Sequence, residues 1–148
     1  MGIDGCGLPA RLGWHIVQGE EIGNWVAERI AGEFYSKNSS AIGLQKDGKT
    51  IAGVINENWN RQSIFCHIAI EGRMTKEYLK AIFDYPFNVC NCKKIIVPVV
   101  SNHVKSIKLV TNMGFTEEAR LKDASLDGDI IFLTLTKENC RFLGVKNG

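Results

Sequence analysis

The sequence predicts an α/β domain built around a mixed β-sheet. An Asp-Gly pair at 47–48 lies between two apolar runs, which is a strong signal of a β-hairpin. The segments 63–70 and 94–99 are both strand-like and are separated by a helical segment. They are therefore expected to pair in parallel through a right-handed crossover. A further Asp-Gly pair at 127–128 predicts a second antiparallel hairpin near the C-terminus.

Length and composition indicate a single globular domain spanning 1–148. The chain has 148 residues, and one domain commonly has about 100 to 200. Hydrophobic residues make up 45% and charged residues 23%, which excludes disorder as the main state. The 18 basic and 16 acidic residues give a net charge of +2, so a dedicated nucleic-acid surface is not expected. A local site for one anionic ligand remains compatible with this balance.

The cysteine pattern favours a reducing compartment. The five cysteines, at 6, 66, 90, 92 and 140, are odd in number and lack the spacing of a disulfide framework. No apolar run approaches 18 residues, and the N-terminus lacks the features of a signal peptide. We therefore expect a cytoplasmic protein without a membrane segment. Cys66, His67, Cys90 and Cys92 can be drawn as a metal site, but one close pair is weak evidence. Core and loop thiols, and no metal, are the preferred interpretation.

The N-terminal half reads as a lead-in followed by a helix and the first hairpin. Residues 1–19 are rich in glycine and predict an irregular segment. From Glu20 onward, apolar residues recur at helical spacing, and Gly32 is a plausible end of that helix. The apolar runs 41–45 and 51–55 then form the two arms of the hairpin.

The central segment alternates between strand and helix. Residues 63–70 place two sets of side chains on opposite faces of a strand: Ile64, Cys66, Ile68 and Ile70 on one, and Phe65, His67 and Ala69 on the other. A helix is predicted over 75–88, with Thr75 as its N-cap and Pro86 ending or kinking it. The run 94–100 is almost entirely apolar, as in a strand buried on both faces, although Pro98 suggests a bend or a lost ladder bond.

The C-terminal third predicts a helix, the second hairpin and a short final helix. Apolar spacing over 104–113 indicates a helix that stops at Gly114. Residues 115–121 and 130–135 supply the arms of the hairpin, and 137–143 is expected to be a terminal helix.

One further motif is Ser101-Asn102 followed by Ser106-Ile107 and Met113-Gly114-Phe115, a helix that leads through Gly-Phe into a strand. This block resembles one found in the GNAT acetyltransferase superfamily, and the resemblance covers residues 20–143. The hairpin at 41–54 and Phe83-Asp-Tyr-Pro-Phe87 support the same resemblance. The branch it resembles most contains the Rim-type ribosomal-protein acetyltransferases and small phage-encoded relatives.

This resemblance implies a fold, a co-substrate and its binding residues. The sheet would be mostly antiparallel, with a central parallel strand pair that splays apart and helices on both faces. Acetyl-CoA would pair its pantetheine with the open edge of strand 63–70, at Ile68 and Ile70. Its pyrophosphate would lie on the loop Gly72-Arg73-Met74-Thr75-Lys76, at a helix N-terminus that attracts anions. Asn102 and Ser106 would contact the cofactor from the next helix or cap that helix.

The chain departs from the family pattern at three places. In the phosphate loop, Glu71, Met74 and Lys76 occupy positions where the family has Arg or Gln and two small residues, so a solvated basic loop is the alternative interpretation. Many relatives place a tyrosine acid where this chain has Val110, which we expect in the core. The expected asparagine is displaced by one residue, so His103 occupies its formal position.

His67 is the candidate catalytic residue. A histidine with a pKa near 6.5 can accept the proton of an incoming amine, although a buried hydrogen-bonded histidine is the alternative. Deprotonation at pH 7 costs about 1 kcal/mol for an N-terminal amine and about 4.6 kcal/mol for a lysine. A single histidine therefore favours an α-amine or a small amine as acceptor.

Two functions are compatible with the sequence. One is an acetyl-CoA-dependent N-acetyltransferase in which an amine of a protein N-terminus or small molecule attacks directly in a ternary complex. The other is a GNAT-fold phage structural or virion-associated protein that has lost catalysis and binds other virion proteins. The altered phosphate loop and Val110 favour the second, whereas the helix cap and the strand pair favour the first.

Overall fold

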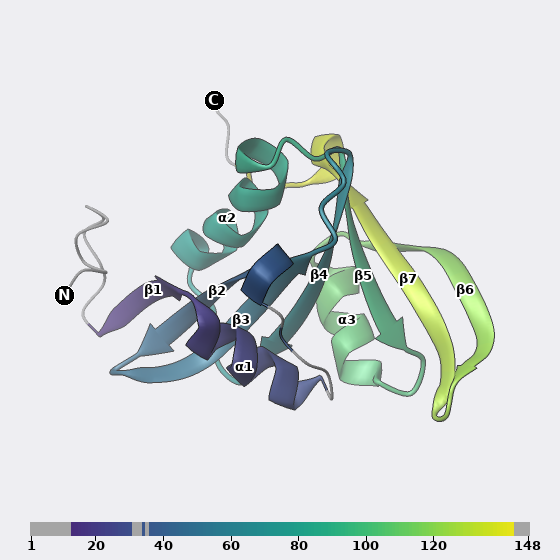
Figure 1. Cartoon of the computed structure of the whole chain (residues 1–148), viewed down its shortest axis with the longest axis horizontal. Coiled ribbons are helices and arrows are strands. Elements are labelled where there is room, and N and C mark those ends of the chain that lie inside the picture. The colour runs from purple at the N-terminus through teal and green to yellow at the C-terminus, as the bar shows by residue number, and fades with distance from the viewer. Residues whose placement is uncertain (1–12, 31–33, 35, 144–148) are drawn as a thin grey trace.

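The computed structural model describes residues 13–30, 34 and 36–143, and the strands in this part form one sheet (Figure 1). Neighbouring strands lie in the order β1-β2-β3-β4-β5-β7-β6. The strands are β1 (Trp14–Gln18), β2 (Ser39–Lys46), β3 (Lys49–Glu57), β4 (Ser63–Ile70), β5 (Lys94–Val100), β6 (Thr116–Ser125) and β7 (Gly128–Thr136). The α-helices are α1 (Glu20–Arg29), α2 (Lys76–Asp84) and α3 (Val104–Asn112).

Both predicted hairpins are confirmed. Strands β2 and β3 pair antiparallel around Asp47 and Gly48, whose φ angles of 53° and 82° suit a two-residue turn with the native strand twist. Strands β6 and β7 pair antiparallel across a turn between Ser125 and Gly128. The two hairpins form opposite halves of the sheet, so the central strands β4 and β5 join them.

Strands β4 and β5 are parallel and separate after three residue pairs. They pair from Ser63 with Lys94 to Phe65 with Ile96, and not beyond. Strand β3 stays paired with β4 up to Ile70, and β7 stays paired with β5 up to Val100. Each strand therefore follows its outer neighbour, and the sheet opens into a V (Figure 1). The splayed parallel pair is confirmed.

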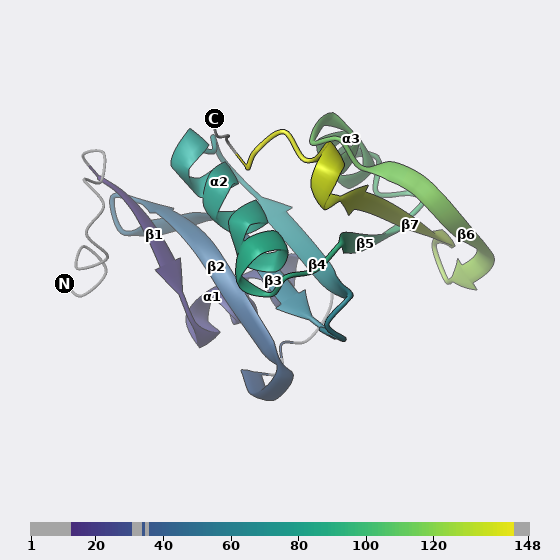
Figure 2. The same cartoon turned by 90° about the horizontal axis from the view of Figure 1, so that it is seen from above.

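Helices cover both faces of the sheet. Helices α2 and α3 lie on one face and α1 lies on the other (Figure 2). Along β4, Cys66 belongs to the core cluster that contains residues of α2 and α3, whereas Ala69 packs in the smaller cluster with Val26 of α1. Because side chains alternate along a strand, His67 faces the side of α1. No helix among the described residues is long and apolar enough to cross a membrane.

One strand lies where the sequence predicted an irregular lead-in. Residues 14–18 form β1, which pairs antiparallel with β2 from Trp14 with Lys46 to Gln18 with Ile42. Gly13 and Gly19 flank this strand with φ angles of 80° and 121°. These glycines produce a loop-like sequence pattern and hide a strand of only five residues. The rest of the predicted lead-in, 1–12, lies outside the described residues.

Two helix ends also differ from their predictions. Helix α2 ends at Asp84, and residues 85–89 form one wider π-type turn, since Pro86 cannot donate to the helical ladder. The predicted terminal helix over 137–143 is wrong: only a short 3₁₀ turn, Lys137–Asn139, is helical. Phe142 stacks on Phe83 with ring centroids 4.9 Å apart, which fixes this segment by tertiary contact. The predicted helix end at Gly32 lies outside the described residues.

A buried hydrogen bond joins α2 to the sheet and provides a test of the packing. The Tyr78 hydroxyl donates to the Ile42 carbonyl oxygen at 2.8 Å, and Tyr78 is fully buried. Replacing it (Tyr78→Phe) should lower the free energy of unfolding by about 1–2 kcal/mol in urea titrations, because the buried carbonyl loses a donor. Leu126→Ala, at a fully exposed side chain, is the control. Equal stability of Tyr78→Phe and the parent would contradict this role.

Candidate functional site

A cleft of about 240 Å³ lies where β4 and β5 separate. It reaches both faces of the sheet, since Ile30 follows α1 on one side and Ser106 lies on α3 on the other. Its lining residues are Ile30, His67, Ile68, Val97, Pro98, Val99, Val100, His103, Ser106, Leu109 and Val110. The structure thus brings three sequence candidates, His67, Ile68 and Ser106, to one cavity.

The walls of this cleft include two strand edges without a partner strand. Beyond Phe65 and Ile96 neither β4 nor β5 pairs with the other. Backbone N–H and C=O groups at such edges need hydrogen-bond partners. An extended molecule with its own amide groups can supply them in the manner of an added strand. Pro98, which looked unfavourable in a buried strand, is tolerated because one edge of β5 is open here.

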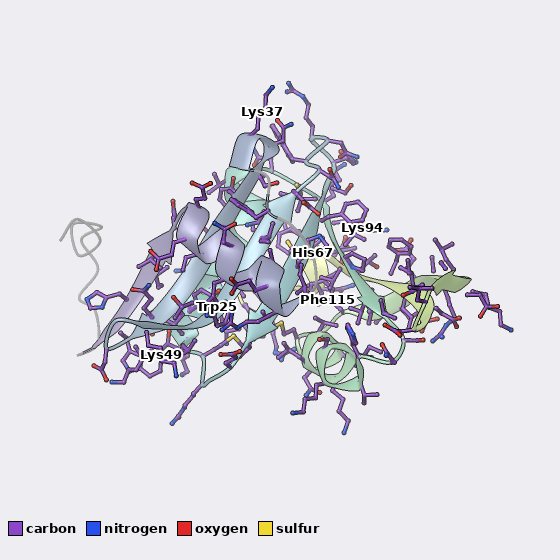
Figure 3. The ribbon with its side chains drawn as sticks, turned by 60° about the horizontal axis from the view of Figure 1, so that its bottom comes forward. Trp25, Lys37, Lys49, His67, Lys94 and Phe115 are labelled. Atoms are coloured by element: carbon purple, nitrogen blue, oxygen red, sulfur yellow. The ribbon has the colours of Figure 1, made fainter. Side chains whose placement is uncertain are left out.

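His67 forms a hydrogen-bonded pair with Glu57 of β3. The Nε2 atom of His67 lies 2.5 Å from Oε2 of Glu57, and the two side chains are 20% and 26% exposed. The register pairs His67 with Ile55 and Glu57 with Phe65, so the two side chains are diagonal neighbours on the same face. Figure 3 shows His67 on the strands between α1 and the half of the sheet that contains β5.

This pair has the arrangement of a carboxylate-oriented acid–base group. A carboxylate that faces one ring nitrogen of histidine fixes the proton there and turns the other nitrogen into a base. Glu57 faces Nε2, so in the tautomer that carries its hydrogen on Nε2 it is Nδ1 that can accept a proton. The alternative interpretation was a buried histidine with a purely structural hydrogen bond. His67 does have such a hydrogen-bond partner, but it also lines the cleft.

The predicted phosphate loop connects β4 to α2 at the open end of the V. Thr75 is the N-cap of α2, and its side chain accepts a hydrogen bond from the Tyr78 amide at 3.1 Å, as predicted. Gly72, Arg73 and Lys76 are exposed, and Met74 is half-buried. At Gly72 a Cβ atom would lie 3.2 Å from Cβ of Ile51, so a larger residue would crowd β3. The loop residues lie outside the lining of the cleft described above.

The start of α3 resolves which of two neighbouring residues faces the cleft. His103 is the N-cap of α3 and lines the cleft, whereas Asn102 lies in the preceding exposed turn and is not among the lining residues. Val110 is 1% exposed and belongs to the core, as predicted, while also contacting the cleft. Ile70, at the end of β4, is half-buried and lies outside the lining set.

Glu57 is a candidate site residue that the sequence analysis did not identify. It ends the hairpin strand β3, and seven residues separate it from Phe65, its partner in the register. Only the register between β3 and β4 identifies Glu57, because antiparallel pairing across the turn at 58–62 places it beside His67. That register cannot be read from the polar turn alone.

A second cavity of about 510 Å³ lies beside the closed end of the strand pair, and Glu57 contributes to its wall. Asn56 is 2% exposed there, and its Oδ1 accepts a hydrogen bond from the Cys66 thiol at 3.0 Å. Burial raises the pKa of Cys66, which keeps this thiol protonated and able to donate. Cys66, Cys90, Cys92 and Cys140 are free thiols. Within the described residues, no three His, Cys, Asp or Glu side chains are placed to hold a metal ion.

Solved acetyltransferases have the same fold. No family model and no curated protein matches this chain. A chimera of the spermidine N-acetyltransferase SpeG from Vibrio cholerae with hSSAT is 16% identical, with a TM-score of 0.67 over 89% of this chain and 99% of that chain. The N-acetyltransferase PseH of Campylobacter jejuni is 15% identical, with a TM-score of 0.52 over 68% and 70%. A probable acetyltransferase is 18% identical, with a TM-score of 0.59 over 70% of this chain.

Two of these neighbours are named as N-acetyltransferases and the third as a probable acetyltransferase, and this chain has a GNAT-like fold with a splayed parallel strand pair. It spans 63% of the length of the probable acetyltransferase, which is the larger protein. At sequence identities of 15–18% the similarity is one of fold, and it does not identify the acceptor substrate of this chain. None of the three neighbours is named as a ribosomal-protein or phage enzyme, so the Rim-type or phage branch stays a prediction.

Proposed function

We propose that this protein is an acetyl-CoA-dependent N-acetyltransferase that acts on a primary amine. The observation that carries the proposal is the His67–Glu57 pair beside the cleft between β4 and β5. A base oriented by a carboxylate, next to two unpaired strand edges, provides both a site for an extended thioester and a proton acceptor for an amine. We place the enzyme in the cytoplasm because the four cysteines in the described part of the chain are free thiols.

The proposed position of acetyl-CoA follows from the open edge of β4. Its pantetheine would pair with this edge at Ile68 and Ile70, and its pyrophosphate would lie over residues 72–76 at the N-terminus of α2. Arg73 and Lys76 are exposed there and add positive charge to that of the helix N-terminus. Ser106 and His103, which line the cleft, would contact the cofactor from the side of α3, and Asn102 would lie next to them in the preceding turn.

The proposed reaction is a direct transfer in a ternary complex. The amine attacks the thioester carbonyl, a C–N bond forms, and the C–S bond to coenzyme A breaks. A backbone N–H of β4 stabilises the oxyanion that develops on the carbonyl oxygen. Nδ1 of His67 takes the proton that the amine loses, and Glu57 stabilises the imidazolium. Both side chains are partly exposed, at 20% for His67 and 26% for Glu57, so the proton can pass from this pair to solvent.

The leaving group does not require a protein acid. A thiol with a pKa near 8.5 leaves as a thiolate at pH 7 at a cost of about 2 kcal/mol. Val110, at the position where many GNAT relatives have a tyrosine, is therefore compatible with catalysis. The transfer would depend on the base more than on an acid.

A second candidate function is a GNAT-fold phage virion protein without catalysis. The observation that favours it is the phosphate loop, where half-buried Met74 and exposed Lys76 replace small residues. Such side chains hinder a close backbone approach to pyrophosphate. Binding of acetyl-CoA separates the two functions, because only the enzyme requires it.

Acetyl-CoA should raise the melting temperature of the protein in a concentration-dependent way. A ligand at 100 times its Kd stabilises the native state by about 2.7 kcal/mol. The double variant Arg73→Ala/Lys76→Ala should weaken this shift, since it removes two cations from the proposed phosphate site. Lys49→Ala, at an exposed lysine that begins β3, is the control. No shift at millimolar acetyl-CoA would exclude the enzyme.

The His67–Glu57 pair should control the pH dependence of acetylation. His67→Ala should lower kcat about 10²- to 10⁴-fold, the usual contribution of a general base, and remove the ascending limb of the pH–rate profile. Glu57→Gln should lower kcat less and leave the KM for acetyl-CoA unchanged, because Glu57 acts through His67. A His67→Ala enzyme with the parental pH profile would exclude His67 as the base.

A further inference from the structure

The face of the sheet that contains His67 continues onto β5 and β7 as an apolar surface outside both core clusters. Phe65 and Phe132 meet edge to face with ring centroids 6.4 Å apart, and Ile96 and Pro98 lie beside them on the intervening strand. All four are half-buried, and none belongs to either core cluster. Helix α1 lies on this face but over the other half of the sheet, across β2 and β3 (Figure 2).

This apolar surface is continuous with the candidate active site. Pro98 lines the cleft and pairs with Phe132 in the ladder between β5 and β7. Phe65 precedes His67 by two residues on β4 and therefore lies on the same face. A molecule whose amine reaches Nδ1 of His67 from this face has its neighbouring atoms over Phe65 and Phe132.

The carboxylates around this surface are already paired. Glu57 faces His67, and Glu118 accepts hydrogen bonds from Lys94 at 2.9 Å and from Thr134 at 2.7 Å. At the edge nearest α1, Glu71 pairs with Arg29 at 2.7 Å. In the described part of this face, each of these carboxylates therefore has a partner within the chain. A second ammonium group on the acceptor would have to break one of these pairs, or would have only the weak attraction of a phenyl ring in place of a carboxylate.

We infer that the acceptor is a monoamine with an apolar group next to the reacting nitrogen, and not a polyamine. The inference rests on the proposed function and names the acceptor of that same site. It separates this chain from the Vibrio cholerae neighbours, which are named as spermidine N-acetyltransferases. An α-amine fits best, because its deprotonation at pH 7 costs about 1 kcal/mol against about 4.6 kcal/mol for an alkylamine, and one histidine supplies the base.

The test compares acceptors that share one reacting amine. Glycinamide, phenylalaninamide and lysinamide differ only in the side chain, and spermidine represents the polyamines. The kcat/KM for α-acetylation of phenylalaninamide should exceed that of glycinamide about tenfold, the gain expected from burying part of a phenyl ring. Lysinamide and spermidine should fall below glycinamide. A ratio of phenylalaninamide to glycinamide under about three, or spermidine above glycinamide, would overturn the acceptor class.

Variants then locate the apolar contact. Phe132→Ala should bring the ratio of phenylalaninamide to glycinamide close to one, and Leu126→Ala, at an exposed position, should keep the parental ratio. Phe132→Ala removes a large side chain from β7 and can destabilise that strand. Phe132→Leu is the milder variant, and its ratio of phenylalaninamide to glycinamide should lie between those of the parent and Phe132→Ala. An unchanged ratio in both Phe132 variants would contradict this site. If no amine is acetylated, both the proposed function and the proposed acceptor class are wrong. If spermidine is preferred, the acceptor class is wrong but the proposed acetyltransferase activity is retained.

Discussion

The separation of β4 from β5 after Phe65 and Ile96 is the constraint on which the rest of the structure depends. Beyond that point β3 holds β4 and β7 holds β5, so two unpaired strand edges face each other within the molecule. Buried backbone groups need partners, and a substrate with its own amides can supply them. The opening also joins the two faces of the sheet, with α3 on one side and His67 directed to the other.

Much of the fold could be predicted from the sequence because its signals are local. Asp47-Gly48 specifies a turn with positive φ, and Thr75 caps the helix that follows β4. Strand β1 is not predictable from the sequence because it is short, is flanked by glycines and pairs with β2 alone. The segment 137–143 has a helical pattern but is not a helix beyond Asn139. Phe142 stacks on Phe83, and a contact between residues so far apart in the chain cannot be predicted from the local pattern.

The site was only partly predictable, for a different physical reason. His67 could be found from the alternation of one strand, which identifies the face it occupies. Its partner Glu57 could not, because their contact depends on the register between β3 and β4 across a five-residue polar turn. Likewise, the choice between Asn102 and His103 at the cleft depends on where α3 begins, and a helix start is uncertain by a residue or more in a sequence.

Amide hydrogen exchange along β4 tests most directly whether acetyl-CoA pairs with the open edge of this strand. With saturating acetyl-CoA, the amides of residues 66–70 that face the cleft should exchange more slowly, because they gain hydrogen-bond partners. Amides in the turn between β2 and β3 should exchange as before. Tight binding of acetyl-CoA without any added protection along β4 would contradict the account.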